Sequence, residues 1–95
     1  MAGYIIARVN VTNPDKYKNY TALTPGAVAA YDGEFIVRGG DTTTVEGPEE
    51  TSRVVVIRFP SVDRANEFWT STEYQTAKIE RAGAAEMSAV IVEGS

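Results

Sequence analysis

The chain of 95 residues contains no cysteine and no histidine. The lack of cysteine excludes disulfides, a thiol nucleophile, a zinc–thiolate site and an iron–sulfur cluster. The lack of histidine excludes a Ser-His-Asp triad, an imidazole base near neutral pH and histidine ligation of haem, zinc or iron. Any catalysis therefore depends on carboxylates, tyrosines, lysines, arginines, hydroxyls or a bound cofactor, and the residues themselves indicate neither a metal nor a cofactor.

The sequence also lacks an excess of positive charge and long apolar runs. Nine Lys and Arg against 13 Asp and Glu give a net charge of −4, which disfavours non-specific binding to nucleic acid. No apolar stretch approaches the ~20 residues that span a bilayer, and the N-terminus has no basic segment typical of a signal peptide. We expect a single cytoplasmic domain over residues 1–95 that binds neither nucleic acid nor membranes.

Hydrophobic periodicity predicts the element order β-α-β-β-α-β. Alternating apolar residues indicate strands at 4–11, 53–59 and 87–92, and one at 34–45 that is broken in its middle. The run at 53–59 is the most apolar, which favours a central strand. In one α+β domain this order is typical of a ferredoxin-like sandwich, a four-stranded antiparallel sheet with two helices on one face.

Capping residues and prolines predict where the helices begin and end. Asn13 is the expected N-cap of the first helix, and Pro25 is expected to interrupt that helix, with Thr24 capping a second short segment. Ser61 or Asp63 is the expected cap of the second helical region, which restarts at Ser71.

Strand alternation gives the sheet two apolar faces. The face that suits the helices contains Ile5, Ala7, Val9, Val11, Phe35, Val37, Val55, Ile57, Phe59, Met87, Ala89 and Ile91. The opposite face, which includes Arg38 if the register is unbroken, holds six more aliphatic residues: Ile6, Ile36, Val54, Val56, Val90 and Val92. Burying each is worth roughly 1.5–3 kcal/mol, and monomers avoid large apolar patches. We therefore predict a homodimer in which two sheets pack face to face.

Gly39 and Gly40 interrupt the second strand directly after Arg38. Glycines inside a strand indicate a β-bulge or a kink. A bulge there would turn the Arg38 guanidinium into a cavity, where it suits a carboxylate or phosphate. The alternative for Arg38 is an ion pair with Glu34, with Glu46 or with a carboxylate of a partner chain.

Aromatic side chains supply most of the other candidate ligand-binding residues. Trp69 and Tyr74 are expected to face the sheet from the second helical region, and Tyr17 and Tyr20 from the first helix. They either pack in the core or line a pocket. Glu46 is the candidate acid or base. Two further arginines are interpreted as solvated or paired across the sheet: Arg53 and Arg58.

Several short segments, in their order and spacing, resemble one bacterial family. The segments are Tyr4-Ile5-Ile6-Ala7-Arg8-Val9, Asn13-Pro14-Asp15 with Tyr17, Phe35-Ile36-Val37-Arg38-Gly39-Gly40, Val45-Glu46-Gly47, Phe59-Pro60-Ser61 and Ser71-Thr72-Glu73-Tyr74-Gln75. They resemble the family catalogued as domain of unknown function 1330. The resemblance implies a ferredoxin-like fold within the dimeric α+β barrel superfamily and implies no particular reaction. That family often carries an acidic residue where this chain has Arg58.

Two functions remain open from the sequence. The first is the binding of a small apolar acid in a pocket between sheet and helices. In its catalytic form the protein would be a cofactor-independent isomerase or monooxygenase, because the wider superfamily includes such enzymes. Its haem-degrading enzymes and dye-decolourising peroxidases fit less well, since histidine is absent. The second is a non-catalytic dimeric domain, structural or stress-related, whose interior is fully packed. A cavity on the order of several hundred Å³ would count against this second function.

Overall fold

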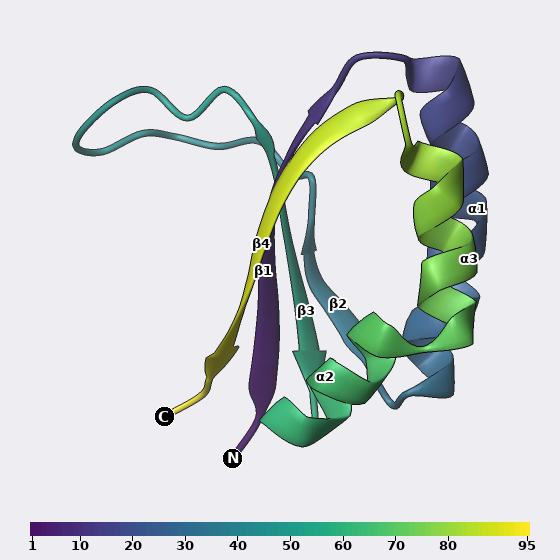
Figure 1. Cartoon of the computed structure of the whole chain (residues 1–95). Helices are drawn as coiled ribbons and strands as arrows, with labels where there is room; N and C mark the ends of the chain where they lie inside the picture. The colour runs from purple at the N-terminus through teal and green to yellow at the C-terminus, as the bar shows by residue number, and fades with distance from the viewer.

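A computed structural model describes all residues, 1–95, and consists of one four-stranded antiparallel sheet with three helices on one face (Figure 1). The elements are β1 (Gly3–Val11), α1 (Pro14–Ala30), β2 (Glu34–Arg38), β3 (Arg53–Phe59), α2 (Val62–Thr70), α3 (Thr72–Arg81) and β4 (Ala85–Glu93). The strand order is β2-β3-β1-β4, so the most apolar strand, β3, is central as predicted. This arrangement confirms the predicted ferredoxin-like α+β fold.

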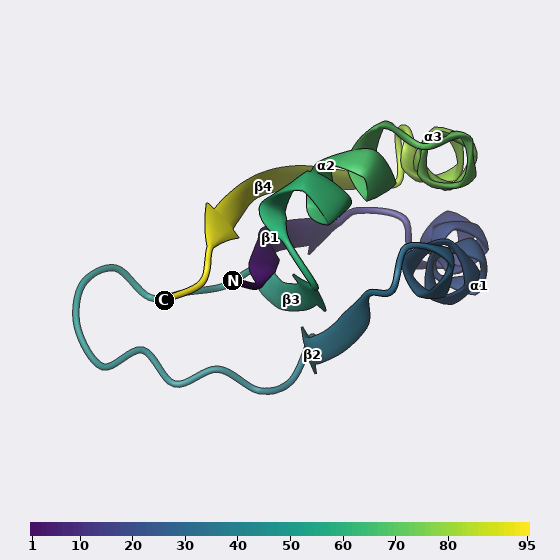
Figure 2. The ribbon, with the colours of Figure 1, turned by 90° about the horizontal axis from the view of Figure 1, so that it is seen from below.

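Helix α1 begins as predicted and continues further than predicted. The Asn13 side chain accepts a hydrogen bond from the Lys16 amide at 3.2 Å. The expected break at Pro25 is wrong, because α1 runs through Pro25 to Ala30. Proline has no N–H for the carbonyl four residues earlier, that of Thr21, and the Thr24 hydroxyl donates to this carbonyl instead, at 3.5 Å. Packing of α1 along α3 further supports the helix (Figure 2).

The second helical region divides at Ser71, as the sequence indicated. The Ser61 hydroxyl caps α2 by accepting from the Arg64 amide at 3.0 Å. The Ser71 hydroxyl accepts from the Tyr74 amide at 3.1 Å and donates to the Phe68 carbonyl at 2.6 Å. Ser71 therefore ends α2 and starts α3, and this turn directs Phe68 and Tyr74 into the core.

Strand β2 ends at Arg38, and the predicted continuation of this strand to Val45 is wrong. Residues 39–52 form a long loop on the side of the sheet away from α1 and α3 (Figures 1 and 2). The last pairing contact is the Gly39 amide donating to the Val54 carbonyl at 2.9 Å. Threonine favours strands, but this preference acts through packing against neighbouring strands, and residues 42–45 have none.

A one-residue register shift in β2 moves Arg38 from the outer face, where an unbroken register would place it, to the helix-side face. Phe35 pairs with Ile57 and Arg38 pairs with Val55, so three steps along β2 match two steps along β3. Such a slip exchanges the two faces of a strand. Arg38 therefore shares the helix-side face with Phe35, and Val37 moves to the outer face. The bulge exists as expected, but it lies between Phe35 and Val37 and not at the glycines.

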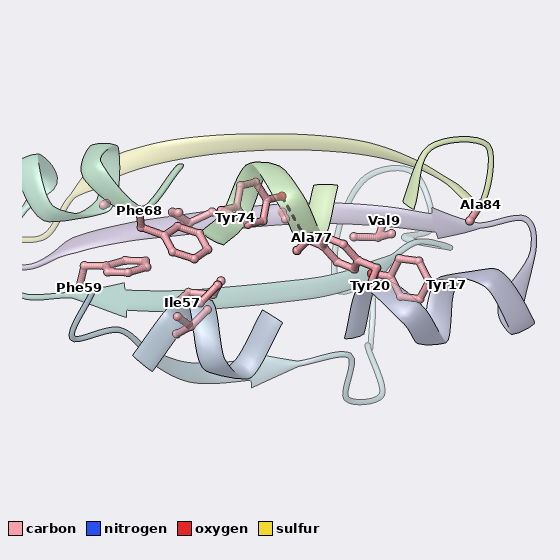
Figure 3. Close-up of a cluster of buried hydrophobic side chains, with 14 residues drawn as sticks. Val9, Tyr17, Tyr20, Ile57, Phe59, Phe68, Tyr74, Ala77 and Ala84 are labelled. Carbon is pink, nitrogen blue, oxygen red and sulfur yellow. Dashed lines mark hydrogen bonds between the residues drawn. The ribbon is translucent and has the colours of Figure 1, made fainter. Parts of the chain in front are cut away.

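The helix-side core is centred on aromatic rings from β3, α1, α2 and α3 (Figure 3). The outer face of the sheet carries no helix. Four of the six aliphatic side chains predicted for this face are exposed, from 36% for Ile6 to 60% for Val90, and the other two, Val54 and Val56, are partly buried. The apolar, uncovered second face predicted from the alternation is thus present. No helix is long and apolar enough to cross a bilayer.

Candidate functional site

A pocket lies between the helix-side face of the sheet and the helices. Its walls come from all four strands and all three helices, and 12 of its 16 lining residues are hydrophobic. Four of the five predicted ligand-binding residues line it: Arg38, Trp69, Tyr74 and Tyr17. The open volume is about 40 Å³, which is room for a few water molecules. The volume of this pocket is therefore much smaller than the several hundred Å³ typical of sites for drug-sized ligands.

Two arginines, from β2 and the start of β3, contribute the charge of the pocket. The Arg38 guanidinium stacks on the Phe35 ring, with its central carbon 4.3 Å from the ring centroid. Arg53 also lines the pocket, so its interpretation as solvated or paired across the sheet is wrong. The strand alternation could have predicted this position. Arg53 lies two and four residues before Val55 and Ile57, so it shares the helix-side face with them.

No carboxylate neutralises these arginines. The ion pairs of the protein join Arg8 to Glu50, Lys18 to Asp15, and Arg64 to Asp32 and Glu67. Neither Arg38 nor Arg53 has a carboxylate within 4.0 Å, so the expected alternative, a pairing of Arg38 with Glu34 or Glu46, is not formed. A pocket wall with two unneutralised guanidinium groups can attract an anion.

Tyr17 lies on α1 beside this positive charge. Burial raises the pKa of the Tyr17 hydroxyl, and the charges of Arg53, Arg81 and Arg38 act in the opposite direction. The net shift is upward, so Tyr17 is neutral near physiological pH. It can therefore donate a hydrogen bond to a ligand oxygen, but it does not act as a phenolate base.

Tyr74 lies at the centre of the aromatic lining. Its ring centroid is 4.8 Å from that of Phe68 and 4.7 Å from that of Trp69. Its hydroxyl is hydrogen-bonded to the buried Tyr20 hydroxyl at 3.0 Å (Figure 3). Burial, followed by the proximity of Tyr74, strongly raises the pKa of Tyr20. The two tyrosines therefore form a hydrogen-bonded pair that joins α1 to α3 across the pocket.

The hydroxyl pair leads to a prediction for stability. The Tyr20→Phe variant should lose about 1–3 kcal/mol of unfolding free energy, because the buried Tyr74 hydroxyl then lacks its partner. The Tyr20→Phe/Tyr74→Phe double variant should recover most of this loss, since no buried hydroxyl remains. Denaturant unfolding at one protein concentration measures both. A double variant clearly less stable than Tyr20→Phe would contradict this account.

Glu46 does not lie with the other candidates. It is exposed on the loop of residues 39–52 and does not line the pocket. Its predicted role as acid or base has no support from the geometry of the protomer. The acidic residues of this loop also form no group of three or more side chains able to hold a metal ion.

Solved structures with this fold include proteins of unknown function and an oxygenase. The RPA0582 protein of unknown function from Rhodopseudomonas palustris is 18% identical with a TM-score of 0.73, over 99% of this chain and 82% of that one. A dimeric ferredoxin-like protein of unknown function from Jannaschia sp. CCS1 is 15% identical with a TM-score of 0.74, over 99% of this chain and 100% of that one. SnoaB, a cofactor-independent oxygenase from Streptomyces nogalater, is 14% identical with a TM-score of 0.70, over 99% and 93%.

At these identities the solved structures show a shared fold alone. No curated protein matches the chain. A family model matches the chain over residues 2–95. It agrees with the segments that carry the resemblance in the sequence, from the first strand to the start of α3. The chain therefore belongs to the family described as Domain of unknown function (DUF1330).

Proposed function

We propose that the protein binds a small apolar acid in the pocket between sheet and helices. The observation that carries this proposal is the unpaired Arg38 guanidinium at the edge of a mainly apolar cavity. Arg38 holds the carboxylate, for which its planar fork is suited. Trp69 and Tyr74 contact the apolar body of the ligand. Because the open volume is small, the side chains that line the pocket shift outward when a ring-sized ligand enters.

Binding is better supported than catalysis. No aspartate or glutamate lines the pocket, and Tyr17 is neutral, so the protomer places no general base beside a bound acid. A cofactor-independent oxygenase or isomerase remains the finer form of the proposal, and the fold shared with SnoaB supports it. It requires a base from outside the pocket, such as Glu46, or a substrate that ionises without one.

We further propose that the protein acts as a homodimer in which two sheets pack through their outer faces. The uncovered aliphatic residues of that face support this assembly. So does the dimeric state of proteins with the same fold from Jannaschia sp. CCS1 and Thermobifida fusca. The loop of residues 39–52 projects from the same side of the sheet and would lie beside the partner (Figure 2).

Replacing Arg38 by alanine tests the binding proposal. Calorimetry with a panel of aromatic and aliphatic carboxylic acids should give affinities roughly 10- to 100-fold weaker in Arg38→Ala, because a charge-assisted hydrogen bond is lost. The matched control is Lys18→Ala, which removes the same charge from an exposed position on α1 away from the pocket. Equal binding of every acid by Arg38→Ala and the wild type would overturn the proposal.

The narrowness of the pocket favours a second candidate, a non-catalytic dimeric domain. A space of about 40 Å³ is close to the fully packed interior that this function predicts. In that case no acid in the panel binds the wild type at millimolar concentration, and Arg38 serves only to cover Phe35. The same calorimetry therefore separates the two functions.

A further inference from the structure

Gly39 lies directly against the guanidinium of Arg53. A side-chain carbon at position 39 would be 2.6 Å from Cζ and 2.9 Å from Nε of Arg53, which is too close for either atom. The backbone of Gly39 also has φ +73°, a conformation that favours glycine. Glycine at this position thus creates the space in which the Arg53 guanidinium rests. The role of Gly39 is therefore not the bulge expected from the sequence, which lies between Phe35 and Val37.

Arg53 rests in this space without a partner of its own. Its Nε atom is buried and makes no hydrogen bond. Burying such a donor, on a group that keeps its charge, is costly unless a ligand supplies the acceptor. Arg38 lies opposite Val55 on the neighbouring strand, and Arg53 lies two residues from Val55 on the same face. The two guanidinium groups therefore border one end of the pocket together.

We propose that Arg53, positioned by Gly39, is a second anion-binding residue, and that the pocket selects acids whose head group carries two negative charges. Dicarboxylates with an apolar tail are the class that fits. This inference rests on the proposed binding function and refines it. A single carboxylate carries one negative charge and so offsets only one of the two positive charges of Arg38 and Arg53. A second carboxylate neutralises the other and gives the buried Nε atom of Arg53 its acceptor.

A matched pair of ligands tests the inference. Benzylmalonate and 3-phenylpropanoate share the same ring and chain and differ by one carboxylate. Calorimetry near neutral pH and 0.15 M salt should show benzylmalonate binding the wild type at least about tenfold more tightly. In Arg53→Gln this preference should fall to about twofold or less, while the affinity for 3-phenylpropanoate stays close to that of the wild type. Arg38→Ala should weaken both ligands.

Substitutions of three glycines test the positioning role of Gly39. Gly39→Ala should displace the Arg53 guanidinium and abolish the preference for benzylmalonate. Gly47→Ala imposes the same kind of backbone strain, at φ +83°, but its added methyl group would have no neighbouring atom. The added methyl group of Gly40→Ala would also have no neighbouring atom. Both controls should keep the preference. In the Arg53→Gln background, Gly39→Ala should change the preference no further.

The outcomes distinguish this inference from the function on which it rests. If neither ligand binds the wild type, the proposed binding function fails. If both bind with equal affinity and Arg53→Gln has no effect, a pocket for apolar acids stands and the selection of dianions is wrong. If Gly39→Ala does not fold, the comparison of Arg53→Gln with the wild type still decides the ligand class.

Discussion

Replacing Ile6 by lysine should convert the proposed homodimer to a monomer. Ile6 lies on the central strand β1, where it pairs with Val56 on one side and Val90 on the other. It is therefore near the middle of the outer face. In a symmetric sheet-to-sheet dimer each substitution places two ammonium groups in the interface. An unpaired buried charge costs several kcal/mol, so the dimer dissociation constant should rise at least about a hundredfold.

Native mass spectrometry and light scattering over a range of micromolar concentrations measure this effect. Ile79→Lys is the matched control, because Ile79 is 70% exposed on α3, away from the outer face of the sheet. It introduces the same charge and should leave the dimer intact. A wild type that is monomeric throughout, or an Ile6→Lys variant that dimerises like the wild type, would show that the outer face is not the interface.

Replacing Phe59 by alanine should remove a large part of the stability of the domain. The Phe59 side chain is only 1% exposed, and its ring centroid lies 5.0 Å from that of Phe68. Gly33 lies so close to the Phe59 ring that no side chain fits between them. Such tight packing leaves a cavity when the ring is removed, at a cost of about 3–5 kcal/mol. Total unfolding free energies are about 5–15 kcal/mol, so this loss is a large fraction of the stability of the domain.

Urea unfolding followed by circular dichroism gives the difference directly. The control is Val45→Ala, which shortens a side chain that is 93% exposed on the loop and should change stability by no more than about 0.5 kcal/mol. Phe59 does not line the pocket, so this test reports on the core and not on the ligand site. A loss below about 1 kcal/mol for Phe59→Ala would mean that the core relaxes into the space.

Much of the fold and part of the site could be predicted because the signals are local. Asn13, Ser61 and Ser71 cap helices through hydrogen bonds to amides three residues away, and such short-range geometry depends little on the rest of the chain. The alternation along the strands identified one face for the core and a second apolar face, which carries no helix. The aromatic spacing of the helices brought Tyr17, Trp69 and Tyr74 to the pocket.

The errors concern residues whose surroundings come from distant parts of the chain. Pro25 is typical of a helix break, but α3, which is distant in the sequence, packs along α1 and supports it. The threonines after Gly40 look like a strand, but no strand lies beside them. Glu46 is the acid or base expected from the sequence because histidine is absent, and the loop places it outside the pocket.

The amino-acid pattern is thus enough to predict the element order, the helix caps, the two apolar faces of the sheet and the absence of thiol and imidazole chemistry. The three-dimensional pairing of the strands is needed to place Arg38 on the helix-side face, to bring Arg53 beside it and to show that Gly39 makes room for Arg53. The physical reason is that strand register depends on the pairing of β2 with β3, and one shifted residue moves a side chain from one face to the other.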